Sequence, residues 1–320
     1  MSLQQRPLGN TGFSIAPLVL GGNVFGWTAD ESTSFDILDA FVDAGFDAID
    51  TADSYSTWVP GHTGGESETI IGRWLARDPS KRDRVHILTK VGSGMPQTGG
   101  KKTLAKQWIV QEVDESLRRL RVDTIDLYQA HWPDQSTPID ETLAAFQHLL
   151  QSGKVRAIGA SNLSAEQLSD ALRVADENGL PRYQTLQPEY NLYDRASYDG
   201  VLRDLCMREG LGVITYYSLA SGFLTGKYRS QADLDKSPRG KGVARYMNER
   251  GMRILHALDE VSARHETVPA TIALAWLMQQ PGVTAPIASA TSREQLATLT
   301  RAADIQLTPD DVAQLDQASA

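Results

Sequence analysis

The chain has 320 residues, 41% of them hydrophobic, and its 40 Asp and Glu outnumber its 31 Lys and Arg, giving a net charge of −9. An acidic chain without a basic block lacks the electrostatic footprint for nucleic acid or an anionic membrane. No apolar run is long enough to span a bilayer, and the first residues lack the apolar core of a signal peptide. The single cysteine, Cys206, excludes an internal disulfide and has apolar neighbours. We therefore expect a cytoplasmic protein in which Cys206 packs in the core.

Apolar runs of strand length alternate with helical patterns along the chain. A hairpin is predicted around the turn at 9–12. Strands are then predicted at 17–22, 46–50, 85–89, 124–130, 155–160, 185–187, 213–217 and 283–288. Helices are predicted at 32–44, 66–77, 104–120, 139–151, 165–177, 198–208, 250–265, 269–279, 292–302 and from 308 onward. The polar stretch 229–248 is predicted to be a surface loop after the seventh strand.

This regular alternation with short connections gives a parallel sheet. Roughly eight strand–helix units without a break in composition favour a closed (β/α)8 TIM barrel over an open sheet. We predict a single domain over 1–320, with the hairpin at its start and extra helices after the seventh strand and at the C-terminus.

The stretch FDAIDTADSY at 46–55 is the first candidate for chemistry. Its apolar start is long enough for one buried strand, and it then changes to Asp50, Thr51, Asp53 and Tyr55. In parallel α/β proteins the loops after the carboxyl ends of the strands carry the reactive groups. Taken alone, the stretch fits a catalytic role and a structural role equally well. In the structural role Asp50 would cap a helix and Tyr55 would fill a gap in the core.

The same change from strand to polar residue recurs down the chain. The residues just past the predicted strands are Asn23, Asp50 with Tyr55, Lys90, His131, Ser161 with Asn162, Gln187, Tyr216 and Ser289. Singly, Lys90 could be a surface lysine and His131 a structural histidine in a turn.

As a set these residues suit the reduction of a carbonyl group. A tyrosine is too weak an acid at neutral pH, and a neighbouring lysine favours the phenolate and lowers the tyrosine pKa. We expect Lys90 to act in this way on Tyr55, with Asp50 holding Lys90 and with His131 donating to the carbonyl oxygen or joining a proton relay. Hydride requires a nicotinamide donor. Its carboxamide could bind Ser161, Asn162 and Gln187, and its ring could stack on Tyr216.

With these residues in place, the chain resembles the aldo-keto reductase family over nearly its whole length. The matching stretches are FDAIDTADSY, ILTKVG, QAHWPD, IGASN, QPEYNL, GFLTGKY and ALAWLMQQPGVTAPI, in this order. The resemblance implies that Asp50, Tyr55, Lys90 and His131 are a catalytic tetrad with Tyr55 as the general acid. It also implies that Ser161, Asn162 and Gln187 bind the nicotinamide carboxamide, and that Tyr216 stacks on the ring.

The resemblance further implies a cofactor site that continues beyond the nicotinamide. Leu219, Gly222, Leu224 and Lys227 would follow the pyrophosphate, and Ser289 and Arg293 would lie near the 2′-phosphate of NADP(H). The match to the family is poorer here, because Ser289, Ala290, Gln295 and Leu299 stand where the family often has Lys, Ser, Arg and Asn. Lys227 and the loop 239–241 are further candidate cations. NADP(H) is the favoured cofactor and NAD(H) the alternative.

Three tryptophans on expected mouth loops, Trp27, Trp58 and Trp132, predict a small-molecule carbonyl or alcohol substrate with an apolar or aromatic body. Each of them could instead pack beneath its loop. The sequence has no GxGxxG motif after a strand, and its six histidines show no paired spacing for a metal, so neither a Rossmann site nor a metal site is expected. Nothing in the sequence indicates the oligomeric state.

Two other classes of function remain as rivals. One is a non-catalytic subunit that binds and senses NADP(H), similar to the β-subunits of voltage-gated potassium channels. The other is a metal-free barrel isomerase or lyase, which would require that no nicotinamide binds.

Overall fold

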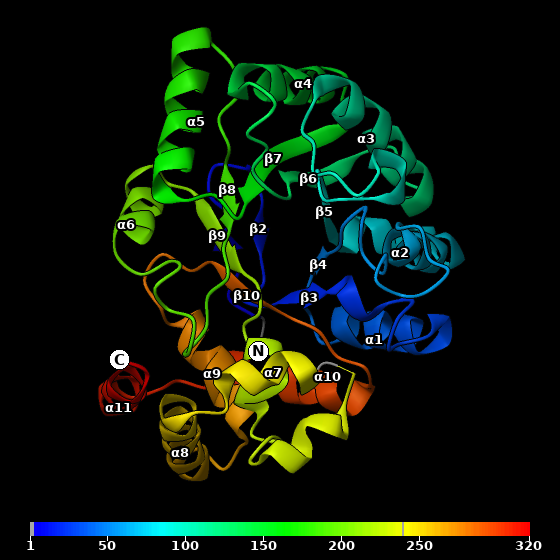
Figure 1. Ribbon diagram of the computed structural model, residues 1–320. Helices are drawn as coiled ribbons and strands as arrows, with labels where there is room; N and C mark the ends of the chain where they lie inside the picture. Colours follow the sequence, from blue (N-terminus) through cyan, green and yellow to red (C-terminus); the bar gives the residue numbers. More distant parts are fainter. Residues whose placement is uncertain (1–2, 239) are drawn as a thin grey trace.

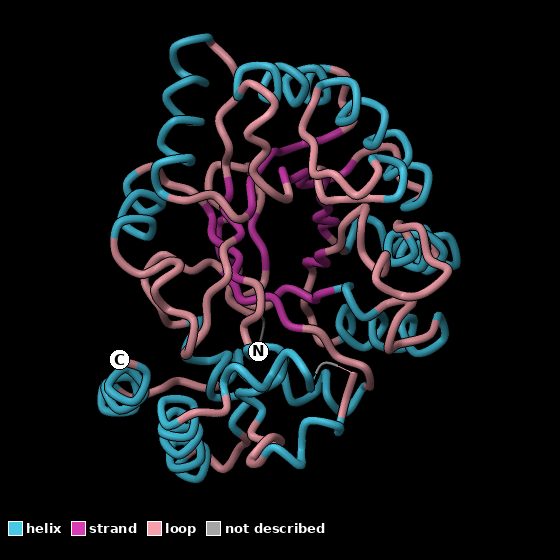
Figure 2. Tube along the Cα trace, in the orientation of Figure 1, coloured by secondary structure: helices cyan, strands magenta, loops and turns pink. Residues whose placement is uncertain are grey.

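A closed barrel of parallel strands lies at the centre of the computed structural model, which describes residues 3–238 and 240–320 (Figure 1). Within these ranges the barrel has eight strands: β3 (Val19–Gly21), β4 (Ala48–Asp50), β5 (His86–Val91), β6 (Ile125–Ala130), β7 (Val155–Ser161), β8 (Thr185–Gln187), β9 (Gly212–Thr215) and β10 (Ala285–Ala288). They are paired in chain order, and β10 closes the ring by pairing with both β9 and β3. Figure 2 shows this ring enclosed by helices. The predicted (β/α)8 barrel is confirmed.

Eleven α-helices are assigned within the described ranges, and capping side chains fix where several of them begin. Their bounds are α1 (Glu31–Asp43), α2 (Glu66–Arg77), α3 (Lys106–Leu120), α4 (Ile139–Gln151), α5 (Ala165–Asn178), α6 (Val201–Arg208), α7 (Gly240–Val243), α8 (Glu249–Arg264), α9 (Pro269–Met278), α10 (Arg293–Thr300) and α11 (Pro309–Ser319). In α1, the Asp30 side chain accepts from the backbone N–H of Thr33, which satisfies one of the unpaired donors of the first turn. Phe35, Leu38 and Phe41 then lie buried at helical spacing against the barrel.

The predicted N-terminal hairpin covers the amino end of the barrel. β1 (Arg6–Pro7) and β2 (Ser14–Ile15) pair antiparallel. Leu8 and Ile15 are fully buried and join the apolar cluster inside the barrel. The turn approaches the barrel so closely that a Cβ on Gly9 would lie 2.3 Å from the carbonyl oxygen of Gln184. The hairpin thus closes this end of the ring.

Extra helices occur where they were expected, after β9 and at the C-terminus. α8 and α11 pack against each other beside α9, as the lower part of Figure 1 shows. The prediction of a plain loop over 229–248 was wrong. This stretch contains short helical turns at Gln231–Lys236, Gly240–Val243 and Ala244–Tyr246. The first turn is stabilised by reciprocal capping between Ser230 and Asp233.

No helix in the described ranges is both long and apolar enough to cross a membrane. The sole cysteine, Cys206, is buried in α6, and burial raises the pKa of its thiol to about 12. The predicted packing role of Cys206 is confirmed by this placement.

Candidate active site

Four of the predicted residues meet at the carboxyl end of three neighbouring strands. Asp50 is the last residue of β4, Lys90 lies near the end of β5, and His131 follows β6 directly. Tyr55 stands in the turn after β4, which brings it back over Lys90. Because parallel strands end at the same rim of a barrel, residues up to 81 positions apart in the chain (131 − 50) come together here.

Lys90 is the hub of this group. Its side chain is 0% exposed, and Nζ donates to Asp50 Oδ2 at 2.7 Å, to the Thr51 carbonyl at 2.8 Å and to the Tyr55 hydroxyl at 2.9 Å. An ammonium has three N–H donors, so all three are used. The lysine is therefore held rigidly, with one donor directed at the tyrosine oxygen.

Tyr55 is protonated in this environment. Its hydroxyl donates to Asp50 Oδ2 at 3.2 Å, and burial, followed by the charge of Asp50, raises the pKa of Tyr55 well above its usual value. The expected net lowering of the Tyr55 pKa was wrong, because burial of the hydroxyl and the Asp50 carboxylate, 3.2 Å away, both raise it. A protonated hydroxyl is nonetheless the form that a general acid requires.

His131 is neutral at this site. Burial and then the charges of Lys90 and Lys102 hold the pKa of His131 well below its usual range. Its ring meets the Tyr55 ring edge-on, with 6.0 Å between centroids. Nδ1 is buried and has no hydrogen-bond partner among the described residues. A neutral imidazole can donate one hydrogen bond to an oxygen that approaches Tyr55.

The residues predicted to bind a carboxamide form one hydrogen-bonded chain beside this group. Tyr216 donates to Asn162 Oδ1 at 2.6 Å, Asn162 Nδ2 donates to Ser161 Oγ at 3.1 Å, and Ser161 Oγ donates to the Gln187 carbonyl at 2.7 Å. Gln187 Nε2 in turn donates to Asp50 Oδ1 at 2.9 Å. The structure thus links the two predicted sets of residues through Asp50 and Gln187.

The segment after β9 has an unusual backbone. Ala220, Ser221 and Gly222 have consecutive φ values of 49°, 57° and 98°, within the helical turn Ala220–Thr225. A Cβ on Gly222 would lie 3.9 Å from Lys227 Nζ, so the lysine ammonium borders this turn. The backbone N–H groups of Ala220 and Gly222 donate to the carbonyls of Tyr217 and Leu219, at 2.7 and 2.8 Å, which fixes the turn. Leu219 packs against the core at the start of the segment, and Leu224 is buried within it.

The last predicted cofactor residues lie at the rim after β10. Ser289 Oγ donates to Asn23 Oδ1 at 2.6 Å, which joins the ends of β10 and β3. Arg293 is the first residue of α10. Of the other cations proposed from the sequence, Arg239 and the side chain of Lys241 lie outside the described residues.

The three tryptophans lie at the mouth. Trp27 and Trp58 meet edge-on at 5.6 Å, Trp58 lies 6.2 Å from the Tyr55 ring, and Trp132 is stacked on His131 at 6.1 Å. Trp58 is 48% exposed, so it does not pack beneath its loop. The three tryptophans thus belong to one series of aromatic contacts that includes the Tyr55 and His131 rings.

Sequence reasoning missed a buried polar network beneath the site. Arg119 of α3 donates to Glu68 of α2 at 2.6 Å and also pairs with Glu112, while Thr89 donates to the second oxygen of Glu68 at 2.6 Å. Burial and the charges of Glu112 and Glu68 raise the pKa of the adjacent Asp53 well above its usual value. The sequence does contain one indication of this network, because Glu68 is a carboxylate on the apolar face of a predicted helix.

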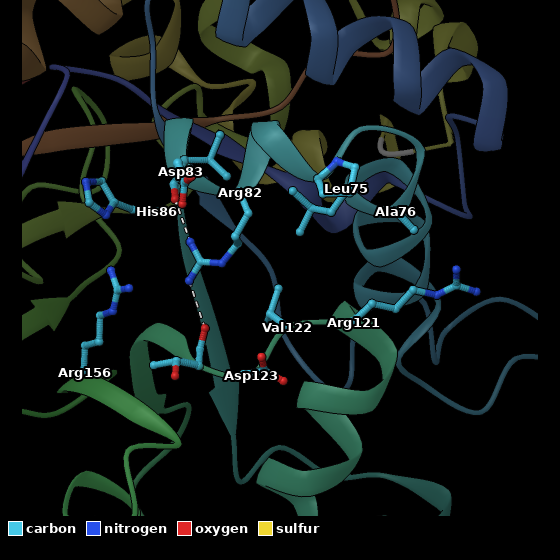
Figure 3. A pocket seen from close by; sticks show the side chains of 12 residues that line it. Leu75, Ala76, Arg82, Asp83, His86, Arg121, Val122, Asp123 and Arg156 are labelled. Atoms are coloured by element: carbon cyan, nitrogen blue, oxygen red, sulfur yellow. Dashed lines mark hydrogen bonds between the residues drawn. The ribbon is translucent and has the colours of Figure 1, made fainter.

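A cleft of about 550 Å³ lies at the opposite end of the barrel and is separate from this site (Figure 3). It lies between the end of α2, the start of β5 and the loop before β6. Arg82 crosses it and donates to the carbonyl oxygens of Val85 and Thr124, each at 2.9 Å. Arg82 and Arg156 also pair with the buried Asp126. These contacts join the amino ends of neighbouring strands, so the charged side chains that line the cleft have a structural role.

A closed (β/α)8 barrel with a half-buried tyrosine in contact with a buried lysine–aspartate pair at its carboxyl end has the architecture of a barrel enzyme. The chain belongs to the aldo/keto reductase family, because the model of the Aldo/keto reductase family matches residues 17–320. It is 35% identical to "Uncharacterized oxidoreductase YrpG" of Bacillus subtilis (strain 168), over 94% of this chain and 91% of the relative.

Two further relatives have more specific names. The chain is 30% identical to "NADH-specific methylglyoxal reductase" of Escherichia coli (strain K12), over 97% of this chain and 96% of the relative. It is 31% identical to "Probable voltage-gated potassium channel subunit beta" of Arabidopsis thaliana, over 98% of this chain and 96% of the relative. The family and the relatives named as oxidoreductases or reductases support an oxidoreductase activity for this chain.

Proposed function

We propose that this protein reduces aldehydes or ketones to alcohols with a nicotinamide cofactor, with NADP(H) favoured and NAD(H) as the alternative. The observation that carries this proposal is the contact of 2.9 Å between Lys90 Nζ and the Tyr55 hydroxyl, placed beside the neutral His131 at the carboxyl end of the barrel. A lysine that is paired with a carboxylate and also contacts the tyrosine hydroxyl holds that hydroxyl in position as a proton donor.

The residues of the chain would divide the chemistry as follows. The nicotinamide, when bound, supplies the hydride. Tyr55 gives its proton to the carbonyl oxygen of the substrate as charge develops there, and Lys90 stabilises the phenolate that remains. His131 donates a hydrogen bond to the same oxygen. Asp50 keeps Lys90 in place, and Gln187 holds the second oxygen of Asp50.

The residues present fit a dinucleotide cofactor. Ser161, Asn162 and Gln187 offer amide and hydroxyl groups for the carboxamide, and Tyr216 offers a ring for stacking. The Lys227 ammonium, which borders the turn at 220–222, offers a cation for the pyrophosphate. Ser289 and Arg293 are the candidates for recognising the 2′-phosphate of NADP(H).

Titration with NADPH and, separately, with NADH tests this proposal, with quenching of the tryptophan fluorescence as the readout. Tight saturation by NADPH with a weak response to NADH would support NADP(H) use, and equal responses would make the enzyme dual-specific. Absence of any response to either cofactor would refute the oxidoreductase proposal.

A second candidate function follows from the similarity to the potassium-channel β-subunit. In this case the protein would bind the nicotinamide tightly, turn over aldehydes almost undetectably, and form a stable complex with a partner protein. Multiple-turnover kinetics with a panel of aldehydes separates it from the enzyme proposal.

We further propose that residues 1–320 act as one domain in the cytoplasm. One continuous apolar core includes residues from the strands and from α8, α9 and α11, which favours a single folding unit. The buried thiol of the only cysteine suits a reducing compartment.

A further inference from the structure

Lys102, in the loop between β5 and α3, lies at the edge of the active-site mouth. Its Nζ lies 3.6 Å from the centroid of the Trp132 ring. Trp132 is stacked on His131 at 6.1 Å, and His131 meets the Tyr55 ring at 6.0 Å. Three successive contacts therefore connect this ammonium to the general acid, and its charge contributes to lowering the pKa of His131.

Lys102 is exposed and makes no ion pair with any acidic side chain in the described part of the chain. Other cations over tryptophan rings in this protein differ in this respect. Lys81 lies over Trp74 and pairs with Asp39, and Arg195 lies over Trp276 and pairs with Asp199 and Asp316. Because Lys102 contacts only the Trp132 ring and no carboxylate of the described residues, its ammonium is available to pair with an anionic ligand.

Asp134, in the adjoining loop after β6, is hydrogen-bonded to the backbone and to hydroxyl groups and forms no ion pair with Lys102. It accepts from the backbone N–H of Leu104 at 2.9 Å, from Ser136 and from Thr137. These bonds attach the segment that carries Lys102 to the loop after β6. On the other side, Thr98 Oγ1 donates to the Lys101 carbonyl at 2.7 Å. The backbone on both sides of Lys102 is thus fixed, while its ammonium forms no ion pair with a described residue.

We propose that Lys102 binds an anionic group of the substrate, so that the enzyme favours carbonyl compounds with a carboxylate or phosphate beyond an apolar or aromatic body. This inference rests on the proposed reductase function. The carbonyl group would lie at Tyr55 and His131, and the body would lie against Trp132. The anionic group would pair with Lys102 at the solvent edge, in place of its hydration. The ammonium is connected to the Tyr55 ring through the Trp132 and His131 rings, so a rigid aromatic spacer between the carbonyl and the anionic group suits the site.

The test compares 4-carboxybenzaldehyde with its uncharged methyl ester as substrates of the full-length protein. In the wild type we expect kcat/KM to be about 2- to 5-fold higher for the carboxylate, within the range of one exposed charge pair. Higher ionic strength should reduce this ratio, because exposed charges are screened by salt.

Three variants assign the preference to one side chain. In Lys102→Met the ratio should fall to about one, mainly through the KM for the carboxylate, and in Lys102→Arg it should be retained. Lys101→Met removes the neighbouring exposed lysine and should leave the ratio unchanged. Because both lysines are exposed, the variants should fold as the wild type does.

Two results would overturn the inference while the proposed function stands. They are reduction of both compounds by the wild type without a preference, and equal loss of the preference in Lys101→Met and Lys102→Met. A wild-type protein that reduces neither compound and binds neither NADPH nor NADH would instead refute the proposed function, and the inference with it.

Discussion

Replacement of Lys90 by methionine is the sharpest test of the site, because it should affect both stability and turnover. The Lys90 side chain is 0% exposed and its partner Asp50 is 1% exposed, so this ion pair has no contact with solvent. Methionine retains most of the aliphatic volume of lysine and therefore opens little cavity. The variant leaves the Asp50 carboxylate buried without its cation.

The expected loss follows from this geometry. Removal of one partner of a buried pair costs about 3–5 kcal/mol, because the other charge remains buried and uncompensated. Asp50 keeps the hydrogen bonds from Gln187 at 2.9 Å and from Tyr55 at 3.2 Å, so we expect the lower end, about 3 kcal/mol. Turnover should fall by about 10²- to 10⁴-fold, the usual contribution of a positioned general acid.

Lys154→Met is the matched control. Lys154 also pairs with a carboxylate, Asp114 at 2.5 Å, but the two side chains are 30% and 56% exposed. Exposed pairs contribute about 0.2–1 kcal/mol. Urea unfolding followed by tryptophan fluorescence compares the two variants, and initial rates with NADPH and an aldehyde measure turnover. If Lys90→Met lost no more free energy of unfolding than Lys154→Met, the assignment of Lys90 as the hub of the site would be refuted.

Three further outcomes are expected. Tyr55→Phe should lower turnover by about 10²- to 10⁴-fold while the quenching by NADPH persists, because only the proton donor is removed; unchanged turnover would exclude Tyr55 as the acid. Gly9→Ala should lower the free energy of unfolding by about 1–3 kcal/mol, since its Cβ would lie 2.3 Å from the Gln184 carbonyl oxygen. Gly12→Ala, where φ is also positive but no atom lies within 4 Å of the new Cβ, should cost less in the same urea unfolding experiment. Hydrogen bonds from Ser136, Thr137 and Leu104 lower the pKa of Asp134 from 3.8 to about 2. A carboxyl with a depressed folded-state pKa contributes stability above pH 3.8 that is lost as the pH falls toward 2. In Asp134→Asn the free energy of unfolding should therefore change less with pH between about 4 and 2. The same pH dependence in the variant and the wild type would contradict the lowered pKa of Asp134.

The order of strands and helices could be predicted from the sequence, because each strand is a short apolar run and each helix has a buried face at regular spacing. Element ends were less accurate where a distant contact decides them. The third helix was predicted from residue 104 but begins at Lys106, since Asp134 binds the backbone N–H of Leu104. The sixth was predicted from residue 198 but begins at Val201, because Gly200 has φ 86° and ψ −128°.

The strand-end residues of the site could be predicted because parallel strands end at a common rim. Interactions between distant loops could not. Lys102 and Trp132 come from two different loops, and their contact depends on the anchoring of one loop to the other through Asp134. The Tyr55 pKa was misjudged for a related reason. The sequence indicates that Asp50 and Lys90 are neighbours, but only the structure gives the distance of 3.2 Å between Asp50 and the tyrosine hydroxyl.

The hairpin across the amino end of the barrel has a consequence for kinetics. With Leu8 and Ile15 filling that end, the carboxyl rim is the route by which both reactants reach the site. Two ligands that share one opening cannot exchange independently when one lies beneath the other. If the nicotinamide occupies the floor beside Tyr216 and the aldehyde lies above it, the cofactor must enter first and leave last. Binding and release are then ordered, and the oxidised cofactor leaves only after the alcohol has left through the same rim.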